Sequence, residues 1–278
     1  MKVVRARYAG ACYGVQRALD MAYAATLDPS PAHTLGPLIH NPQVVERLAA
    51  HGVKVASSLD DVREGIVIIR SHGVVPEVKA EAQRRGLPLM DATCPHVARA
   101  QKAAASLAQE GYQVIIVGEE GHPEVEGMKA YARTDGREVI VAVDAKGLPE
   151  HLEGPVGIVV QTTQSKENLE AVEAALEARG FKPLVKNTIC FATRQRQEAA
   201  ADLAGEVDAL VVIGGRNSSN TSRLFEICRQ SCPRSHHIEV PAEIDPSWFT
   251  GCATVGVTAG ASTPEDQIEA VIDLLEAL

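Results

Sequence analysis

Three short stretches decide the organisation of this chain: DATCPH at residues 91–96, NTICFAT at 187–193 and AGACYGV at 9–15. Each stretch follows a short apolar run and carries one cysteine where a strand pattern gives way to a helix pattern. These cysteines are Cys12, Cys94 and Cys190, and about a third of the chain separates each one from the next. One local arrangement that recurs at this spacing indicates an internal repeat.

Two further kinds of strand-to-helix joint also occur three times each. The first kind comprises HTLGPLIHNPQ (33–43), VIIVGEEGHPE (114–124) and LVVIGGRNSSN (210–220). The second kind comprises IVIIRSHGVVPE (66–77), GIVVQTTQSKEN (157–168) and ATVGVTAGASTPED (253–266). A chance arrangement of ordinary strand–helix units is the alternative to a true repeat.

Alternating strands and helices of this length predict parallel sheets, whose ligands bind beyond the carboxyl ends of the strands. We therefore predict an α/β fold of three similar lobes, arranged as a pseudo-threefold cloverleaf around a central cavity. Lobe 1 spans 13–95, lobe 2 spans 96–190, and lobe 3 spans 191–278 and is completed by the N-terminal strand 1–12.

Helix boundaries are marked by local signals. Asn41-Pro42 and Thr263-Pro264 each place a capping side chain before a proline, which predicts a helix that starts at that proline. Glycines are expected just beyond four helix ends, at Gly52, Gly86, Gly111 and Gly180.

The composition narrows the class of protein. Of the 278 residues, 45% are hydrophobic and 23% are charged, which is typical of a globular protein. The apolar runs have the length of strands, so we expect no membrane span, and the N-terminus shows no signal peptide, so we expect a cytoplasmic location. A net charge of −9 without a basic run argues against nucleic-acid binding.

Six cysteines in a reducing compartment are buried thiols, metal ligands or reactive groups rather than disulfides. If the strand ends of the lobes converge, Cys12, Cys94 and Cys190 converge with them, each near a helix N-terminus that favours a thiolate. Three thiolates suit a [4Fe-4S] cluster that keeps one iron site open to substrate. Cys228, Cys232 and Cys252 lie outside these joints and are not expected to bind the cluster.

The other joints carry uncharged or weakly charged polar side chains. Beside helix N-termini these side chains would form a donor-rich pocket suited to a diphosphate group. A surface or capping role is the alternative for any one of these histidines. The candidates are His40, His72, His122, Ser218, Ser219, Asn220 and Ser262.

Glu124, two residues after His122, is the candidate proton donor for a departing hydroxyl group. A glutamate in the first turn of a helix is also favoured by the helix dipole, so a structural role is the alternative. Thr162 could orient the proton path or cap a helix.

Taken in order from residue 10 to residue 264, nine of these motifs resemble the 4-hydroxy-3-methylbut-2-enyl diphosphate reductase family. They are GACYGV, GPLIHNPQVV, RSHGV, DATCP, GHPEVEG, QTTQS, NTICFAT, GGRNSSNTSRL and VGVTAGASTP. The resemblance implies a three-lobed iron–sulfur enzyme in which the three repeat cysteines bind the cluster and the polar residues above bind the substrate diphosphate. It implies that Glu124 delivers the proton, with His122 and Thr162 assisting.

The implied reaction removes the hydroxyl group with two electrons and protons and gives isopentenyl and dimethylallyl diphosphate. The implied electron donor is a ferredoxin or a flavodoxin, because GGRNSSN lacks the glycine spacing of a dinucleotide-binding loop. Ala11 departs from the family pattern, which usually has phenylalanine before the first cysteine; this departure puts the stability of the cluster in question.

Two alternatives belong to other classes. Cys228 and Cys232, with His236 and His237, have a spacing compatible with a zinc-stabilised binding protein. The same fold without catalysis would be a diphosphate-binding or redox-sensing relative, although the presence of Glu124 and all three repeat cysteines argues against that reading.

Overall fold

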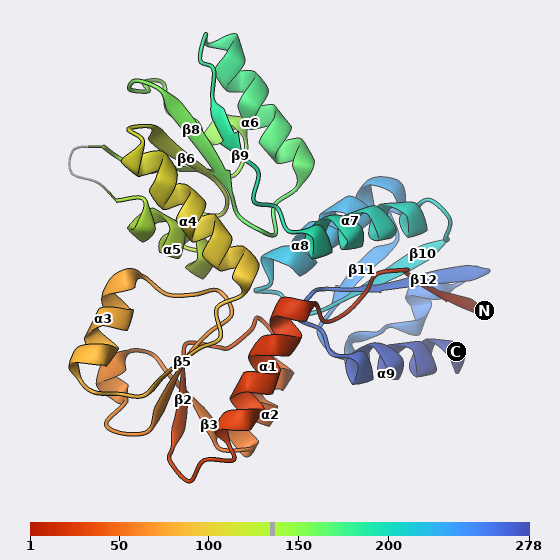
Figure 1. Ribbon diagram of the computed structural model, residues 1–278. Helices are drawn as coiled ribbons and strands as arrows, with labels where there is room; N and C mark the ends of the chain where they lie inside the picture. Colours follow the sequence, from red (N-terminus) through yellow and green to blue (C-terminus); the bar gives the residue numbers. More distant parts are fainter. Residues whose placement is uncertain (134–136) are drawn as a thin grey trace. The chain divides into compact units, whose positions relative to one another are not determined.

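Figure 1 shows the computed structural model of the protein, which describes residues 1–133 and 137–278. Strands and helices alternate along the chain, and within the described residues β1 to β12 form three four-stranded sheets whose strand pairings are all parallel. The predicted α/β class, with three similar lobes of parallel sheet and flanking helices, is confirmed.

The three sheets share one strand order. In each sheet the first strand of the repeat lies between the second and third, and the fourth lies beyond the third, giving β3-β2-β4-β5, β7-β6-β8-β9 and β11-β10-β12-β1. The N-terminal strand therefore takes the fourth place of the last sheet, where Lys2 pairs with Thr254. The strands are β1 Lys2–Arg5, β2 Ala32–Leu35, β3 Val53–Ala56, β4 Ile66–Ile69, β5 Leu89–Asp91, β6 Gln113–Val117, β7 Ile140–Ala142, β8 Val156–Val160, β9 Leu184–Lys186, β10 Ala209–Ile213, β11 Ser235–Ile238 and β12 Thr254–Ala259.

Among the described residues, five of the α-helices connect hydrogen-bonded parallel strands of one sheet, three connect strands of different sheets, and the last one follows the final strand. The α-helices are α1 Tyr13–Ala25, α2 Pro42–Ala50, α3 Pro76–Arg84, α4 Pro95–Gln109, α5 Pro123–Tyr131, α6 Lys166–Ala178, α7 Phe191–Ala204, α8 Ser219–Ser231 and α9 Glu265–Glu276. Within the described residues, none of the helices has both the length and the apolar character needed to cross a membrane.

The predicted helix boundaries are confirmed in most cases. The four predicted glycines follow the ends of α2, α3, α4 and α6 and have the positive φ angles that glycine adopts without strain. Helix α2 starts at Pro42 as predicted. Helix α9 starts one residue later than predicted, at Glu265, because Pro264 is the extended N-cap residue and the Thr263 hydroxyl donates to the carbonyl of Ile213 instead.

The contacts between residues divide the chain into two compact units. Unit 1 comprises residues 1–15, 40–43 and 191–278, and unit 2 comprises 16–39 and 44–190. The predicted lobe boundaries and the predicted arrangement around a central cavity stay predictions.

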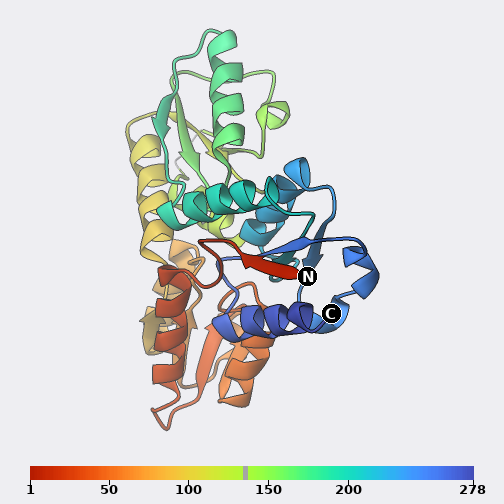
Figure 2. The ribbon, with the colours of Figure 1, turned by 90° about the vertical axis from the view of Figure 1, so that its right-hand side faces the viewer.

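Unit 1 is a three-layer α/β/α sandwich. Alternate residues of β10 point to opposite faces of the sheet: Val211 packs toward α9, while Leu210 packs toward α7 and α8. Figures 1 and 2 show α9 on one side of this sheet and α7 on the other. Since both faces are covered, β10 reads as the continuous apolar run ALVVI rather than as an alternating pattern.

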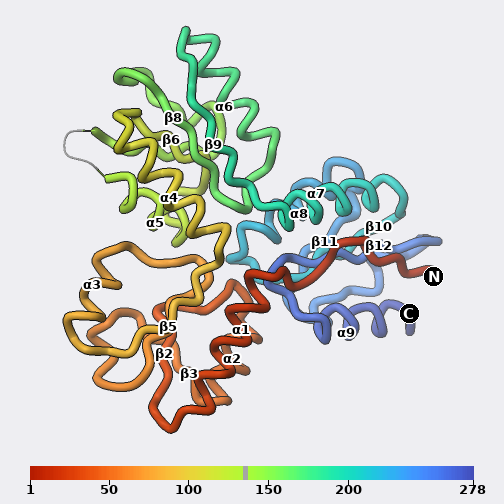
Figure 3. Tube along the Cα trace, viewed as in Figure 1, coloured from red at the N-terminus to blue at the C-terminus, as the bar shows by residue number. Residues whose placement is uncertain are grey.

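Unit 2 holds the other two sheets. Ile116 of β6 packs against α4 and α5, and Ile115 packs against α6, so this sheet too is covered on both faces. The trace in Figure 3 shows α4 and α5 on one side of β6 and β8 and α6 on the other. The sheet of β2 to β5 packs one face against α3 through Val67 and Ala82.

Candidate functional site

The three repeat cysteines occupy equivalent positions in the three lobes. In each lobe the N–H of the cysteine donates to a backbone carbonyl just beyond the strand that is third in the repeat (β12, β4 or β8). The acceptor is the second residue after the end of that strand. These bonds run from Cys12 to Ala261 (3.1 Å), from Cys94 to Ser71 (2.9 Å) and from Cys190 to Thr162 (3.1 Å). The repeat inferred from three short motifs therefore extends to individual backbone hydrogen bonds.

Each of these cysteines also stands at the amino end of a helix. Cys94 is the N-cap residue of α4, and Cys12 and Cys190 directly precede α1 and α7. All three are half-buried, and none of the six cysteines, which all lie in the described part of the chain, forms a disulfide. Helix N-termini stabilise thiolates, so the donor set has the chemistry that an iron–sulfur cluster requires.

Within residues 1–133 and 137–278, no group of three or more His, Cys, Asp or Glu side chains is arranged to hold a metal ion. A single ion draws its ligands close together, whereas a cluster distributes its thiolates over several iron atoms. The donor chemistry fits a cluster, and the joint action of the three cysteines stays a prediction.

Glu124 lies in the first turn of α5 with 2% of its surface exposed. Its Oε1 accepts the N–H of Thr162 at 2.7 Å, and its Oε2 accepts the hydroxyl of Thr162 at 2.8 Å. Burial raises the pKa of Glu124 to about 7, against the opposing effect of these two hydrogen bonds. A carboxyl group with this pKa can hold and release a proton near neutral pH.

Thr162 connects this acid to a repeat cysteine. The side chain and N–H of Thr162 bind Glu124, while its carbonyl accepts the N–H of Cys190. Sequence reasoning named all three residues, and the structure brings them together through one residue at the carboxyl end of β8.

His72 and His122 are in contact within unit 2. Their rings meet edge to face with centroids 5.7 Å apart. His122 is the N-cap residue of α5, and its Nδ1 accepts the N–H of Glu124 at 3.1 Å, which leaves Nε2 to carry the hydrogen of the neutral ring. Burial and then the charge of Arg70 lower the pKa of His122 to about 4, so the ring is a neutral donor at physiological pH.

Ser262, one of the polar candidates of unit 1, lies against the 40–43 segment. The hydroxyl of Ser262 donates to the carbonyl of His40 at 3.1 Å, and the Asn41 amide donates to the carbonyl of Ser262 at 3.0 Å. Gly215 approaches so closely that an added Cβ would lie 2.5 Å from the His40 carbonyl oxygen. The loops after β10 and β12 are therefore both held against this segment.

Ser218, Ser219 and Asn220 form the start of α8. Ser218 caps the helix by accepting the N–H of Thr221 at 3.3 Å, and all three side chains are at most 8% exposed. Both amide atoms of Asn220 are buried, and no side chain or backbone group of the described residues hydrogen bonds to them. A buried amide of this kind costs free energy unless a bound group satisfies it, so this helix start has the chemistry of an anion-binding site.

Two arginines that sequence reasoning missed support these segments. Arg70 is half-buried at the carboxyl end of β4 and lies against the backbone of Gly36, where an added Cβ would be 2.6 Å from its guanidinium. Arg196 of α7 is 7% exposed and donates two hydrogen bonds to the carbonyl of Gly10, at 3.0 and 2.8 Å. Arg70 is the first residue of the RSHGV motif, which is its only signal in the sequence, and Arg196 has none.

The residues of the zinc alternative point in separate directions. Cys228 and Cys232 are buried and direct their thiols to the carbonyls of Ala200 and Val207. His236 stacks on Trp248, while His237 bonds to the carbonyl of Gly214. Burial raises the pKa of Cys228 to about 12, which is typical of a core thiol rather than a metal ligand.

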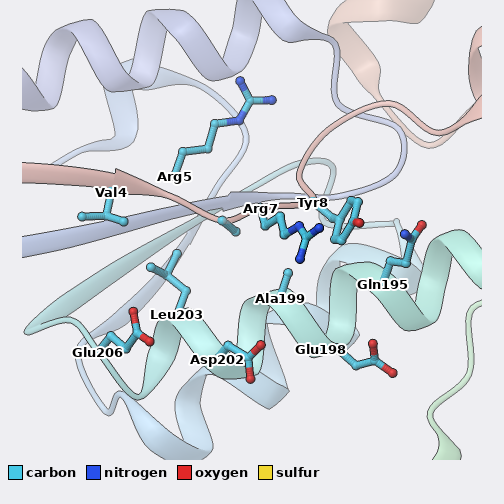
Figure 4. Close-up of a pocket in the computed structure, with 11 residues that line it drawn as sticks. Val4, Arg5, Arg7, Tyr8, Gln195, Glu198, Ala199, Asp202, Leu203 and Glu206 are labelled. Atoms are coloured by element: carbon cyan, nitrogen blue, oxygen red, sulfur yellow. The ribbon is translucent and has the colours of Figure 1, made fainter.

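A groove in unit 1 lies apart from all of the candidates. One wall of the groove is formed by the end of β1 and the residues that follow it, and the other wall is formed by α7. Figure 4 shows the side chains that line the groove. It contains no cysteine and none of the predicted diphosphate-binding residues. Ala11, the departure noted above, is half-buried and does not line it.

Known proteins resemble this chain over nearly its whole length. A family model described as LytB protein matches residues 3–276. The chain is 49% identical over 281 residues to a 4-hydroxy-3-methylbut-2-enyl diphosphate reductase of Citrifermentans bemidjiense, an alignment that covers 100% of this chain and 98% of that protein. It is 48% identical over 272 residues to the reductase of the same name from Pelobacter propionicus, covering 98% and 96%.

Two solved structures are similar over nearly the whole chain. One is a structure of (E)-4-hydroxy-3-methyl-but-2-enyl diphosphate reductase, the terminal enzyme of the non-mevalonate pathway, with 43% identity, a TM-score of 0.72 and 100% of both chains covered. The other is the E-1-hydroxy-2-methyl-but-2-enyl-4-diphosphate reductase of Plasmodium falciparum, with 26% identity, a TM-score of 0.91, and 99% of this chain and 87% of that chain covered.

Proposed function

This chain belongs to the LytB protein family, and on that premise we propose which of its residues carry the family's reaction. It is a 4-hydroxy-3-methylbut-2-enyl diphosphate reductase, the terminal enzyme of the non-mevalonate pathway. We expect the products to be isopentenyl and dimethylallyl diphosphate. Removing the hydroxyl group as water consumes two electrons and two protons, so the site must hold an anion, accept electrons and deliver a proton.

Cys12, Cys94 and Cys190 are the proposed ligands of a [4Fe-4S] cluster with one open iron site. Their support is the equivalence of their three backbone hydrogen bonds and their placement at three helix starts. When bound, such a cluster would supply Lewis-acid and one-electron chemistry.

The diphosphate group is proposed to bind to the candidates of unit 1, which are Ser218, Ser219, Asn220, Ser262 and His40, together with His72 and His122. The buried amide of Asn220 at the start of α8 is the strongest support, because an anion there would satisfy its donor. His122 contributes a neutral Nε2–H, since its Nδ1 is already occupied by the N–H of Glu124.

Glu124 is the proposed proton donor. A pKa of about 7 keeps much of this buried carboxyl protonated at neutral pH, and Thr162 orients both of its oxygens. The observation that carries the proposal is the chain of contacts from Glu124 through Thr162 to Cys190, because it joins an acid of suitable pKa to a proposed cluster ligand inside one compact unit.

A ferredoxin or flavodoxin remains the proposed electron donor, and the cytoplasm remains the proposed location. Neither nucleic acid nor membrane is a proposed partner, given the net charge of −9 and the helix lengths.

The test is anaerobic purification followed by optical and electron spin resonance spectra with and without 4-hydroxy-3-methylbut-2-enyl diphosphate. We expect a brown protein whose reduced spectrum changes when substrate is added. Glu124→Gln should keep the cluster spectrum and the substrate-induced change while losing most turnover. Full turnover by Glu124→Gln would refute the proton-donor role, and a colourless protein with zinc alone would refute the iron–sulfur assignment.

A further inference from the structure

Two large aromatic side chains are exposed next to proposed cluster ligands. Tyr13 is 71% exposed and follows Cys12 in the chain, and Phe191 is 60% exposed and follows Cys190. Exposed aromatic side chains that gather on one surface mark interaction sites, because they gain most from being covered by a partner.

Both aromatic residues belong to unit 1 and sit on a firmly held framework. Buried Arg196, five residues into α7 from Phe191, donates two hydrogen bonds to the carbonyl of Gly10. The start of α7 is thereby fixed to the loop that carries Cys12 and Tyr13. A preorganised surface of this kind loses little entropy when a partner binds.

Two arginines complete this surface. The guanidinium of Arg194 lies 5.7 Å from the ring centre of Phe191, and that of Arg7 lies 5.2 Å from the ring centre of Tyr8. Both arginines are exposed, and neither forms an ion pair with any carboxylate in the part of the chain that the structure describes. Aromatic residues with arginine are the composition that protein interfaces favour.

Helix α7 is electrically polarised along its length. Its first turn carries Arg194 and the positive end of the helix dipole, whereas Glu198, Asp202 and Glu206 follow at intervals of one turn. In Figure 4 Arg7 lies over Ala199 near the middle of the groove, Tyr8 lies between Arg7 and Gln195, and Glu206 lies at the other end. On a chain of net charge −9, Arg7 and Arg194 are two exposed cations that form no ion pair within the described residues, with Glu198 one helical turn beyond Arg194.

We propose that the surface formed by Arg7, Tyr8, Tyr13, Phe191 and Arg194, here called the aromatic–arginine patch, docks a small acidic one-electron carrier protein. The inference rests on the proposed function. An acidic carrier is attracted to these two unpaired arginines, while the net charge of −9 opposes its contact with acidic parts of the chain, which orients the carrier. Docked there, its redox centre faces the two residues that are covalently joined to Cys12 and Cys190.

The electron balance requires two encounters per turnover. In each encounter one carrier molecule is oxidised by one electron, and the two electrons with two protons release the substrate hydroxyl as one water. A small reductant needs no docking surface, so the patch matters only when the donor is a protein.

The test compares two donors on the anaerobic holoenzyme: a purified ferredoxin of net negative charge, and a chemically reduced viologen. Arg194→Glu should raise the KM for ferredoxin by about tenfold or more. It should also make this KM less dependent on the salt concentration. Turnover with viologen should stay at the wild-type level. Phe191→Ser should raise the KM for ferredoxin while leaving the salt dependence unchanged.

The matched control is Arg229→Glu, because Arg229 is exposed in the same unit and its guanidinium also lies 5.7 Å from a phenylalanine ring, that of Phe225. It should behave as wild type with both donors. Equal effects of the two arginine variants on ferredoxin turnover, or none from Arg194→Glu, would overturn the proposal. An equal loss of turnover with viologen would also overturn it. The proposal would likewise fail if the wild type were a dimer in solution and Arg194→Glu were a monomer with unchanged ferredoxin turnover, because the patch would then bind a second copy of the chain. Failure of the wild type to turn over with either donor would instead contradict the proposed function itself.

Discussion

Replacing Thr162 with valine isolates one hydrogen bond of the proposed proton donor. Valine keeps the shape of threonine and the backbone N–H that Glu124 Oε1 accepts at 2.7 Å, but it removes the hydroxyl that donates to Oε2 at 2.8 Å. A hydrogen bond to a charged group contributes about 1.5–3 kcal/mol and one between neutral groups about 0.5–1.5 kcal/mol. The carboxylate therefore loses about 1–1.5 kcal/mol relative to the neutral acid, which raises the pKa by about one unit.

The sign of the effect on activity follows from the role of Glu124. A proton donor is active when protonated, so turnover falls as the pH rises through its pKa of about 7. In Thr162→Val this falling limb should move up to about pH 8, whatever the height of the profile. The assay is the pH dependence of kcat with reduced viologen under anaerobic conditions.

Thr163→Val is the matched control, since the hydroxyl of Thr163 accepts a hydrogen bond from Gln161 at 3.1 Å and is not bonded to Glu124. Its falling limb should stay where it is in the wild type. A limb that stays in place in Thr162→Val, or that moves to lower pH, would refute the assignment of this limb to Glu124.

Three further outcomes are expected. The pKa of Glu124 is raised from 4.5 to about 7 in the folded protein, so its stabilising contribution is complete below pH 4.5 and is lost as the pH rises through 7. Glu124→Gln, whose amide stays neutral, should therefore raise the unfolding free energy at pH 8 by on the order of 3 kcal/mol, and an unchanged melting temperature there would count against the buried-acid reading. Gly215→Ala places a Cβ 2.5 Å from the His40 carbonyl and should weaken inhibition by inorganic diphosphate, whereas Gly205→Ala, with its nearest neighbour at 3.5 Å, should not. Asn220→Leu should raise the melting temperature, because it removes buried amide atoms that cost about 1–3 kcal/mol, and should abolish diphosphate inhibition; retained inhibition would remove Asn220 from the site.

The features that depend on local sequence could be predicted. The positions of the cysteines at strand-to-helix joints follow from patterns within about ten residues, and the structure has each of them at a helix start. Glu124 and Thr162 were named from two separate motifs, and the hydrogen bonds between them were not predicted because they join positions that are adjacent only in the folded sheet.

The features that depend on packing could not be predicted. Arg70 influences His122 across two neighbouring lobes of unit 2, and Arg196 reaches Gly10 from the opposite part of the chain. Neither arginine belongs to a periodic pattern that distinguishes it from an exposed cation. The start of α9 was misplaced by one residue because the Thr263 hydroxyl bonds to a strand carbonyl rather than to its own helix.

The most direct test of the central claim is the iron and sulfide content of anaerobically purified cysteine variants. If Cys12, Cys94 and Cys190 hold one cluster, the separate replacement of each by serine should deplete iron and sulfide together and to a similar extent. Cys252→Ser, which alters a thiol packed against the core of unit 1, should keep the wild-type content. Wild-type iron and sulfide in any one of the first three variants, or an equal loss in Cys252→Ser, would contradict the claim.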